Sequence, residues 1–325
     1  MADTSPGAAR RRTLLAALLG VPVLGVPLLG SCSTAGPAAP PPSTGAAPSG
    51  TTPSGPGGAG EAVSAELPEL AELEERHGAR LGVRVVDTGS GAAVGHRADE
   101  RFPVCSLISA YAAGALLVAN DWADGFFQQV ITYERAELIG NSPVTGSRVD
   151  GGMTVAELCD AAIAHDDSTA LNELLSLVGG PEAITAFAFA LGDEQTRLDR
   201  WEPDLNAAEP GDERDTSTPG ALAAGYRNLV LGTALEGARE RAELRGWLEG
   251  GGTVLRSVVP RGWVVGGKPG AAEYGTRCDA AIAWPPDRDP LVVVLMSTRP
   301  ERDARADGTL LGDAARVALG AMGVG

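Results

Sequence analysis

The stretch "RFPVCSLISAY", residues 101–111, separates two kinds of sequence pattern. Before it, a leucine-spaced helix over 66–78 precedes "RLGVRVVDT" and "AAVGHRA", which alternate like the strands of a hairpin. From Ser106 to about residue 231, apolar residues recur three and four positions apart between glycines, as in successive helices. The stretch therefore leads into a helical block, and its serine opens an apolar helix. Such a serine is either a helix-initiating residue or a nucleophile.

Strand-like runs return near the end of the chain as "GWVVGGK", "DAAIAWPP" and "PLVVVLMST", followed by a helix over 309–322. We expect strands from both chain ends to pair in one antiparallel sheet flanked by helices. The predicted fold is α/β plus all-α: an α/β domain from 66–102 and 233–325, with an all-α domain, 103–232, inserted between them. A functional site is expected at their junction.

The N-terminus is typical of an export signal, residues 1–32. Arg11 and Arg12 precede an apolar run, as in a twin-arginine signal, and "LGSC" resembles a lipobox that would place a lipid on Cys32. A transmembrane anchor is the alternative, but prolines and glycines interrupt the run. Residues 33–65, nearly all Ala, Pro, Gly, Ser and Thr, predict a disordered tether. We expect a lipoprotein on the outer face of the cell membrane, or a secreted protein.

Charge and metal-ligand content exclude several functions for these 325 residues. A net charge of −16 argues against nucleic-acid binding and leaves the lipid anchor as the expected membrane contact. The histidines have no ligand-like spacing, so we predict neither a metal site nor a cofactor. The odd set Cys105, Cys159 and Cys278 favours inert buried thiols over a disulfide framework. We expect a monomer that binds a small molecule.

The most specific segment is "GDEQTRLDRWEPDLNAAEPGDERDTSTP", residues 192–219, and "SPVT" and "GGMTVAELCDAAI" upstream fit the same pattern. Over 66–322 the chain resembles the class A β-lactamases, serine penicillinases that share a fold with penicillin-binding proteins. The resemblance implies an Ω-loop over 197–215 with an Arg200–Asp215 ion pair at its neck. It also implies that Ser106 forms an acyl-enzyme.

Each of the three short motifs of that family departs from its usual form here. In "CSLIS" the lysine position of S-x-x-K holds Ser109, and a serine hydroxyl cannot act as the base that activates Ser106. In "HDDSTA" the S-D-N element reads Asp166, Asp167, Ser168. In "GGKPG" the K-[ST]-G element reads Lys268, Pro269, Gly270.

These departures remove groups with defined roles in the family. The first residue of S-D-N relays a proton to the leaving nitrogen, which Asp166 could do only if protonated. Ser168 is shorter than the asparagine that holds the substrate amide, and Pro269 lacks the hydroxyl that binds the substrate carboxylate. The two aspartates also fit an idle, solvated helix end.

Other implied site residues are present. By resemblance, Glu202 and Asn206 position and activate the hydrolytic water. The N–H groups of Ser106 and Ala271 form the oxyanion hole, and Arg277 helps to bind the substrate carboxylate. Lys268 is the only lysine in the chain, which favours a role for its compact ammonium in a crowded cleft over chance survival.

Three functions remain open. The first is a β-lactamase-like enzyme with weak or absent hydrolysis, in which Glu202 acting through water is the only base. The second is a pseudoenzyme that binds a β-lactam or a cell-wall peptide without turnover. The third is a serine esterase that uses the remaining oxyanion hole.

Overall fold

The computed structural model describes residues 67–324. The predicted export signal, Cys32 and the whole of the predicted tether lie outside the described residues. Within residues 67–324, no single helix is long and apolar enough to cross a membrane. The helices Ser168–Val178 and Pro181–Ala190, bent by 71°, pass a test of length and composition only as a pair.

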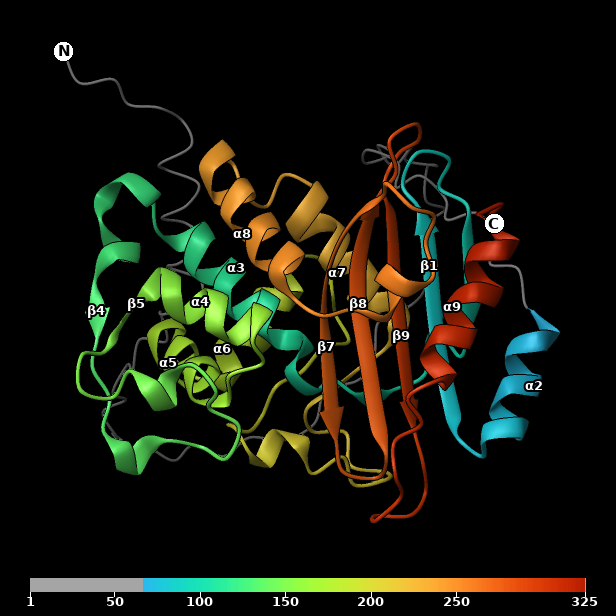
Figure 1. The fold of residues 1–325 in the computed structure, drawn as a ribbon, viewed down its shortest axis with the longest axis horizontal. Coiled ribbons are helices and arrows are strands. Elements are labelled where there is room, and N and C mark those ends of the chain that lie inside the picture. Colours follow the sequence, from blue (N-terminus) through green and yellow to red (C-terminus); the bar gives the residue numbers. More distant parts are fainter. Residues whose placement is uncertain (1–66, 325) are drawn as a thin grey trace, which may run out of the picture.

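A five-stranded antiparallel sheet combines both ends of the described chain in the order β2-β1-β9-β8-β7 (Figure 1). The strands are β1 (Arg80–Asp87), β2 (Ala93–His96), β7 (Val264–Ala272), β8 (Thr276–Trp284) and β9 (Leu291–Thr298). Arg80 pairs with Thr298, so the first strand lies directly beside the last one. The predicted fold class, an antiparallel sheet built from both chain ends and flanked by helices, is confirmed.

Alternation along the strands supplies both faces of this sheet with apolar side chains. Val293 and Leu295 in β9 point into a cluster with the helices α2 (Pro68–His77) and α9 (Leu310–Ala321). Their neighbours Val292 and Val294 join a second, larger cluster on the helical side. The sheet therefore lies between two helical layers, as Figure 1 shows.

The larger cluster is built mainly from the middle of the chain. Its helices are α3 (Ser109–Ala119), α4 (Val155–Ala164), α5 (Ser168–Val178), α6 (Pro181–Ala190), α7 (Pro219–Tyr226) and α8 (Ala238–Gly250). Two short strand pairs join loops: β3 (Phe102–Pro103) with β6 (Thr216–Ser217), and β4 (Val130–Ile131) with β5 (Met153–Thr154). Thr154 and Glu157 begin α4 with a reciprocal capping box.

The helix that was expected to open at Ser106 begins later. Ser106 lies in a 3-10 turn, Cys105–Ile108, and the α-helix α3 starts at Ser109. Cys105 has a φ of 49°, in the left-handed region that a residue with a side chain seldom adopts. The chain therefore turns sharply at Cys105 before the helix can begin.

The edge strand β7 packs closely against this 3-10 turn. A Cβ on Gly270 would lie 2.8 Å from Cys105 Cβ, 2.6 Å from Cys278 Sγ and 3.2 Å from the backbone nitrogen of Ser106. Only a glycine allows this approach. The contact joins the sheet to the helical layer where the sequence predicted the site.

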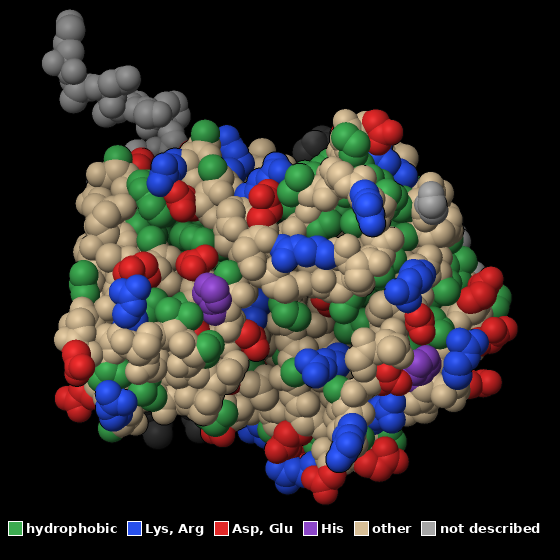
Figure 2. Space-filling view, viewed as in Figure 1, with side chains coloured by type: hydrophobic (Ala, Val, Ile, Leu, Met, Phe, Trp, Pro, Cys, Tyr) green, Lys and Arg blue, Asp and Glu red, His purple; other side chains and the backbone are tan. Residues whose placement is uncertain are grey.

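On the face seen in Figure 2, acidic and basic side chains are interspersed.

Candidate active site

Ser106 is held in its turn by partners from distant parts of the chain. The backbone N–H of Val104 donates to the carbonyl of Asp215 at 2.9 Å. The hydroxyl of Tyr226 donates to the carbonyl of Leu107 at 2.7 Å. Ser106 itself is 8% exposed. The turn is thus fixed on both sides of the serine, with Ser106 at the edge of accessibility.

The two predicted oxyanion-hole residues lie on neighbouring backbone. Ala271 follows Gly270 in β7, and Gly270 approaches the Ser106 nitrogen as described above. Backbone N–H groups at such a point could stabilise a developing negative charge on a carbonyl oxygen. This part of the site depends on backbone groups, and its only side-chain requirement is a glycine at position 270.

Ser109 occupies a buried place one turn after Ser106 and offers no base. Its side chain is 1% exposed, and its hydroxyl oxygen has no hydrogen-bond partner among the described residues. A buried polar atom without a partner destabilises the fold unless water or a ligand satisfies it. The structure thus shows an unsatisfied position where the S-x-x-K motif requires a cation.

Lys268 is fully buried and forms an ion pair with Asp166. A buried ammonium needs a partner of opposite charge, because it has lost its hydration. Asp166 comes from the segment before α5, with a φ of 55°, and its side chain remains 44% exposed. The only lysine is therefore already neutralised, and it does not reach the reaction centre as an unpaired cation.

Asp167 is structural, and the idea of a solvated helix end is wrong for it. It is completely buried. Its carboxylate accepts hydrogen bonds from Val144 N, Thr145 N and Thr145 Oγ1, and from Ala170 N at the start of α5. These donors satisfy it internally. Asp167 thus holds the segment that carries Asp166 and Ser168 in place.

Glu202 and Asn206 meet as the resemblance implied. Asn206 Nδ2 donates to Glu202 Oε2 at 2.6 Å, while Asn206 Oδ1 is buried without a partner among residues 67–324. Burial, then the negative charge of Asp166, raises the pKa of Glu202 to about 7, against opposing effects of Lys268, Ser168 and Asn206. Glu202 is therefore a poised acid–base group at neutral pH.

The neck of the Ω-loop is closed by the predicted ion pair. Arg200 Nε lies 2.5 Å from Asp215 Oδ2, and Asp215 is 1% exposed. The other carboxylate oxygen, Oδ1, accepts from the backbone N–H groups of Asp199 and Arg200 at 2.7 and 2.9 Å. Since the backbone of Asp215 also binds Val104, this residue connects the Glu202 loop to the Ser106 turn.

Two asparagines that sequence reasoning missed complete the framework. Asn172, on α5, binds the backbone of Glu202 twice: its Nδ2 donates to the carbonyl, and its Oδ1 accepts from the N–H, both at 3.0 Å. The side-chain Nδ2 of Asn141 donates to the carbonyl of Asp166 at 2.6 Å, and the backbone carbonyl of Asn141 accepts from the N–H of Ser168 at 2.8 Å. Neither residue lies near its partners in sequence, so no local pattern could have revealed them.

Arg277 is exposed on β8, in register with Ala271. Within residues 67–324 it forms no ion pair. Pro269, in the edge strand between Lys268 and Gly270, is paired in register with Asp279 and does not break the ladder. The described residues contain no group of three or more His, Cys, Asp or Glu side chains placed to hold a metal ion.

The three remaining cysteines are buried free thiols. Burial raises the pKa of Cys159 well above its usual range, so this thiol stays protonated and unreactive. The pKa of Cys278 is raised as well, first by burial and then by the neighbouring thiol of Cys105. The expectation that the thiols are buried is confirmed.

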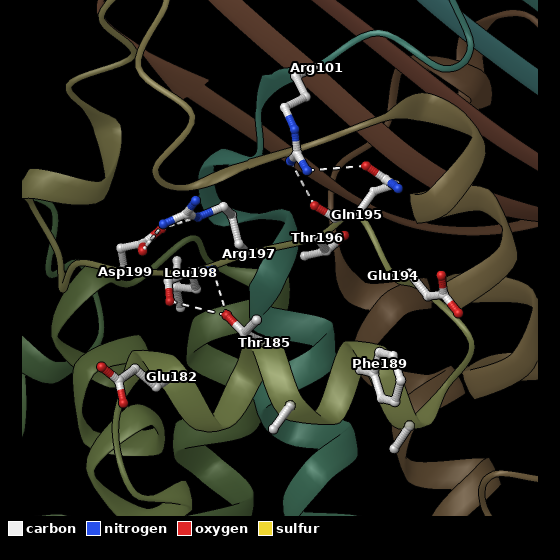
Figure 3. Close-up of a pocket in the computed structure, with 12 residues that line it drawn as sticks. Arg101, Glu182, Thr185, Phe189, Glu194, Gln195, Thr196, Arg197, Leu198 and Asp199 are labelled. Carbon is white, nitrogen blue, oxygen red and sulfur yellow. Dashed lines mark hydrogen bonds and ion pairs between the residues drawn. The ribbon is translucent and has the colours of Figure 1, made fainter. Parts of the chain in front are cut away.

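A surface hollow of about 670 Å³ lies away from these residues (Figure 3). It is bordered by α6 and by the segment that leads into the Ω-loop. In it Arg101 holds Gln195, and Thr185 bonds both the N–H and the carbonyl of Leu198. None of Ser106, Glu202 and Lys268 lines it. This hollow is therefore separate from the residues to which the sequence assigns chemistry.

Comparison with known proteins supports the same assignment as the geometry. A sequence model of the beta-lactamase enzyme family matches residues 65–322. The chain belongs to the class A β-lactamase family. It is 55% identical over 259 residues to a beta-lactamase of Nocardia asteroides, covering 79% of this chain and 83% of the relative. A beta-lactamase of Nocardia farcinica is 51% identical over 257 residues, 78% of this chain and 82% of the relative.

Solved structures give the same result for the fold. The beta-lactamase from Burkholderia ambifaria superimposes with a TM-score of 0.77 at 44% identity, covering 79% of this chain and 99% of that one. The beta-lactamase from Streptomyces albus G gives 0.76 at 43%, with coverage of 79% and 98%. Within this class A β-lactamase scaffold, the strand that carries Lys268 packs against the Ser106 turn, and Lys268 and Asp166 both affect the pKa of Glu202.

The Ω-loop should open when Arg200 is replaced by alanine. The change leaves the buried carboxylate of Asp215 without its cation, which should lower the free energy of unfolding by roughly 1–3 kcal/mol. Limited proteolysis should then cleave between residues 197 and 215. Arg214→Ala is the matched control, because Arg214 is half exposed and pairs with Asp212 in the same loop. Equal cleavage of both variants would show that the neck pair does not hold the loop.

Proposed function

We propose that this class A β-lactamase homologue reacts with β-lactams through Ser106 to form an acyl-enzyme, slowly, and hydrolyses it weakly or not at all. The observation that carries the proposal is the pairing of Lys268 with Asp166. In addition, the hydroxyl of Ser109 has no partner among the described residues. The hydrogen bond between Asn206 and Glu202 and the approach of β7 to the Ser106 nitrogen support a site that holds a reacting carbonyl and a water. The cations and hydroxyls that would move the proton of Ser106 are missing or occupied.

Loss of an activating base typically lowers a rate by ~10²–10⁴-fold without abolishing it. Glu202 can still act through a water held by Asn206, whose buried Oδ1 has no other partner among the described residues. The relatives named beta-lactamase support the substrate class. Binding without turnover is the second candidate, and the neutralised Lys268 favours it.

We also propose export and attachment to the membrane through lipid on Cys32. The support is the "LGSC" sequence after an apolar run, followed by the Ala/Pro/Gly/Ser/Thr-rich segment 33–65. Mass spectrometry of the mature protein should show a diacylated Cys32 at its N-terminus. A Cys32→Ala chain should be released from the membrane fraction. An unmodified N-terminus on a soluble product would contradict lipidation.

A fluorescent penicillin followed by intact-mass analysis tests the reaction itself. The expected result is a slowly formed, long-lived adduct of one penicillin on Ser106, absent in Ser106→Ala. Hydrolysis of a chromogenic cephalosporin should be far slower than by an ordinary class A enzyme. Rapid turnover contradicts an impaired site, whereas reversible binding with no adduct identifies a binding protein.

The decay of the adduct should depend on pH through Glu202. Because the folded pKa of this carboxyl is about 7, only its ionised form, which increases above that pH, can accept a proton from water. The decay rate should fall roughly tenfold per unit well below pH 7 and level off above pH 8. Glu202→Gln should remove this dependence. Decay that ignores pH between 5 and 9 would assign the base to another group.

Replacing Ser109 by lysine should restore part of the missing proton transfer. The new amine would lie one turn from Ser106 on the same helix face, near enough to act as its base. Acylation should speed up by ~10²-fold or more, and by more than deacylation. Ser109→Met, of comparable length without the charge, is the control. Adding Asp166→Ser and Ser168→Asn should increase turnover further, and non-additively.

If the triple variant keeps its thermal stability yet reacts no faster than the parent, Glu202, Lys268 and the oxyanion N–H groups are not in productive geometry. The impaired-enzyme proposal then fails.

A further inference from the structure

The ion pair of Lys268 gives the candidate site, called the cleft below, an unusual charge. The ammonium lies fully inside the protein, and Asp166 is its only hydrogen-bonded partner among the described residues. Asp166 is 44% exposed in its side chain. An approaching ligand therefore meets the anionic member of the pair first, and the cation lies behind it.

Other carboxyl groups surround the same lysine. The charge of Lys268 lowers the pKa of Glu202, on the Ω-loop, and of Asp279, in β8, although burial raises both to about 7. Asp166, Glu202 and Asp279, which come from three different segments, thus all interact electrostatically with the ammonium of Lys268. Pro269, next to Lys268 in β7, offers neither an N–H nor a hydroxyl to an anion. Arg277, which forms no ion pair among the described residues, lies on β8 opposite Ala271. Ala271 is three residues after Lys268 in β7.

The geometry of acylation puts a specific part of the ligand in this region. In a β-lactam the scissile bond joins the carbonyl carbon to the ring nitrogen, and a penicillin carries its carboxylate on the next ring atom. During acylation the Ser106 oxygen bonds to that carbon, the carbon–nitrogen bond breaks, and the serine proton ends on the nitrogen. The substituent beside the nitrogen is thus separated from the Ser106 oxygen by only a few covalent bonds. Lys268 lies two residues before Gly270, the residue of β7 that packs against the Ser106 turn, so the Lys268–Asp166 pair faces this part of the ligand in the proposed complex.

We propose that Asp166 makes this cleft select acyl compounds whose group beside the scissile bond is neutral or cationic, such as an ester, an amide or an ammonium, over those with a carboxylate. A carboxylate there would be desolvated beside Asp166 and could reach Lys268 only by displacing its partner. A neutral group avoids this repulsion, and a cationic group gains from it. This inference names the substrate class of the proposed function and rests on it.

Benzylpenicillin and its methyl ester test this selection, because they share the reacting carbonyl and differ in one charge. Intact-mass analysis gives the rate of Ser106 adduct formation with each. The ester should acylate the parent protein roughly tenfold faster than the acid. Asp166→Asn should remove or reverse that preference. Asp160→Asn is the matched control, since Asp160 is a half-exposed aspartate on α4 that should leave the preference unchanged.

Asp166→Asn removes the hydrogen-bonded anion of the buried Lys268, so a second variant guards against loss of folding. The double variant Asp166→Asn, Lys268→Met removes both charges and should show no preference between acid and ester. Faster reaction of the parent with the acid overturns the proposal, and an acid preference that disappears in Arg277→Ala would show that Arg277 determines recognition instead.

Failure of the proposed function gives a different result. If no compound acylates Ser106, equilibrium dialysis of Ser106→Ala with the acid and the ester still measures the charge preference. Tighter binding of the ester supports the inference for a binding protein, and tighter or equal binding of the acid overturns it.

Discussion

The packing of the edge strand β7 against the turn at Ser106 depends on one missing side chain. At Gly270 a single methyl group would overlap Cys278 Sγ and Cys105 Cβ and press on the Ser106 nitrogen. Because the strand can come this close, the N–H groups of Ser106 and Ala271 can share one space. The same approach lets a strand from the last third of the chain carry Lys268 to the helical layer. The candidate site thus forms where the sheet and the helical layer come into contact at Gly270.

Electrostatics then explains why the altered motif residues form a consistent set. Serine at 109 removes a cation from the centre of the site, and aspartate at 166 adds an anion. Lys268 cannot remain buried alone, and Asp166 satisfies it. The negative charge of Asp166 is the second cause, after burial, that raises the pKa of Glu202 to about 7. Asp166 therefore compensates the buried charge of Lys268 and also increases the protonated fraction of Glu202 near neutral pH, whereas Lys268 acts in the opposite direction on Glu202.

The local sequence pattern was sufficient to predict the helices and strands and a sheet built from both chain ends. Strand alternation and helical spacing depend only on residues that are close together in the sequence. It misplaced the start of the helix after Ser106. The unusual φ of Cys105 is imposed by contacts with β7 and Asp215, which lie far away in sequence. The motif positions were sufficient to predict the candidate site residues, but they did not predict the hydrogen-bond partners of those residues. Asn172, Asn141 and the donors to Asp167 become visible only when the loops are in place.

The retained and the altered positions differ in what they do physically. Gly270, the Arg200–Asp215 pair, Asn172 and Asp167 all act on backbone: they hold turns, loop necks and helix starts. Ser109, Asp166 and Pro269 stand where side chains would move protons or bind an anion. A fold can keep the first set for stability whatever becomes of the second, since a lost backbone contact exposes or orphans buried groups. Backbone contacts thus persist around Ser106 with little means of transferring the proton of its hydroxyl, and the charge added at Asp166 gives the site the selectivity proposed above.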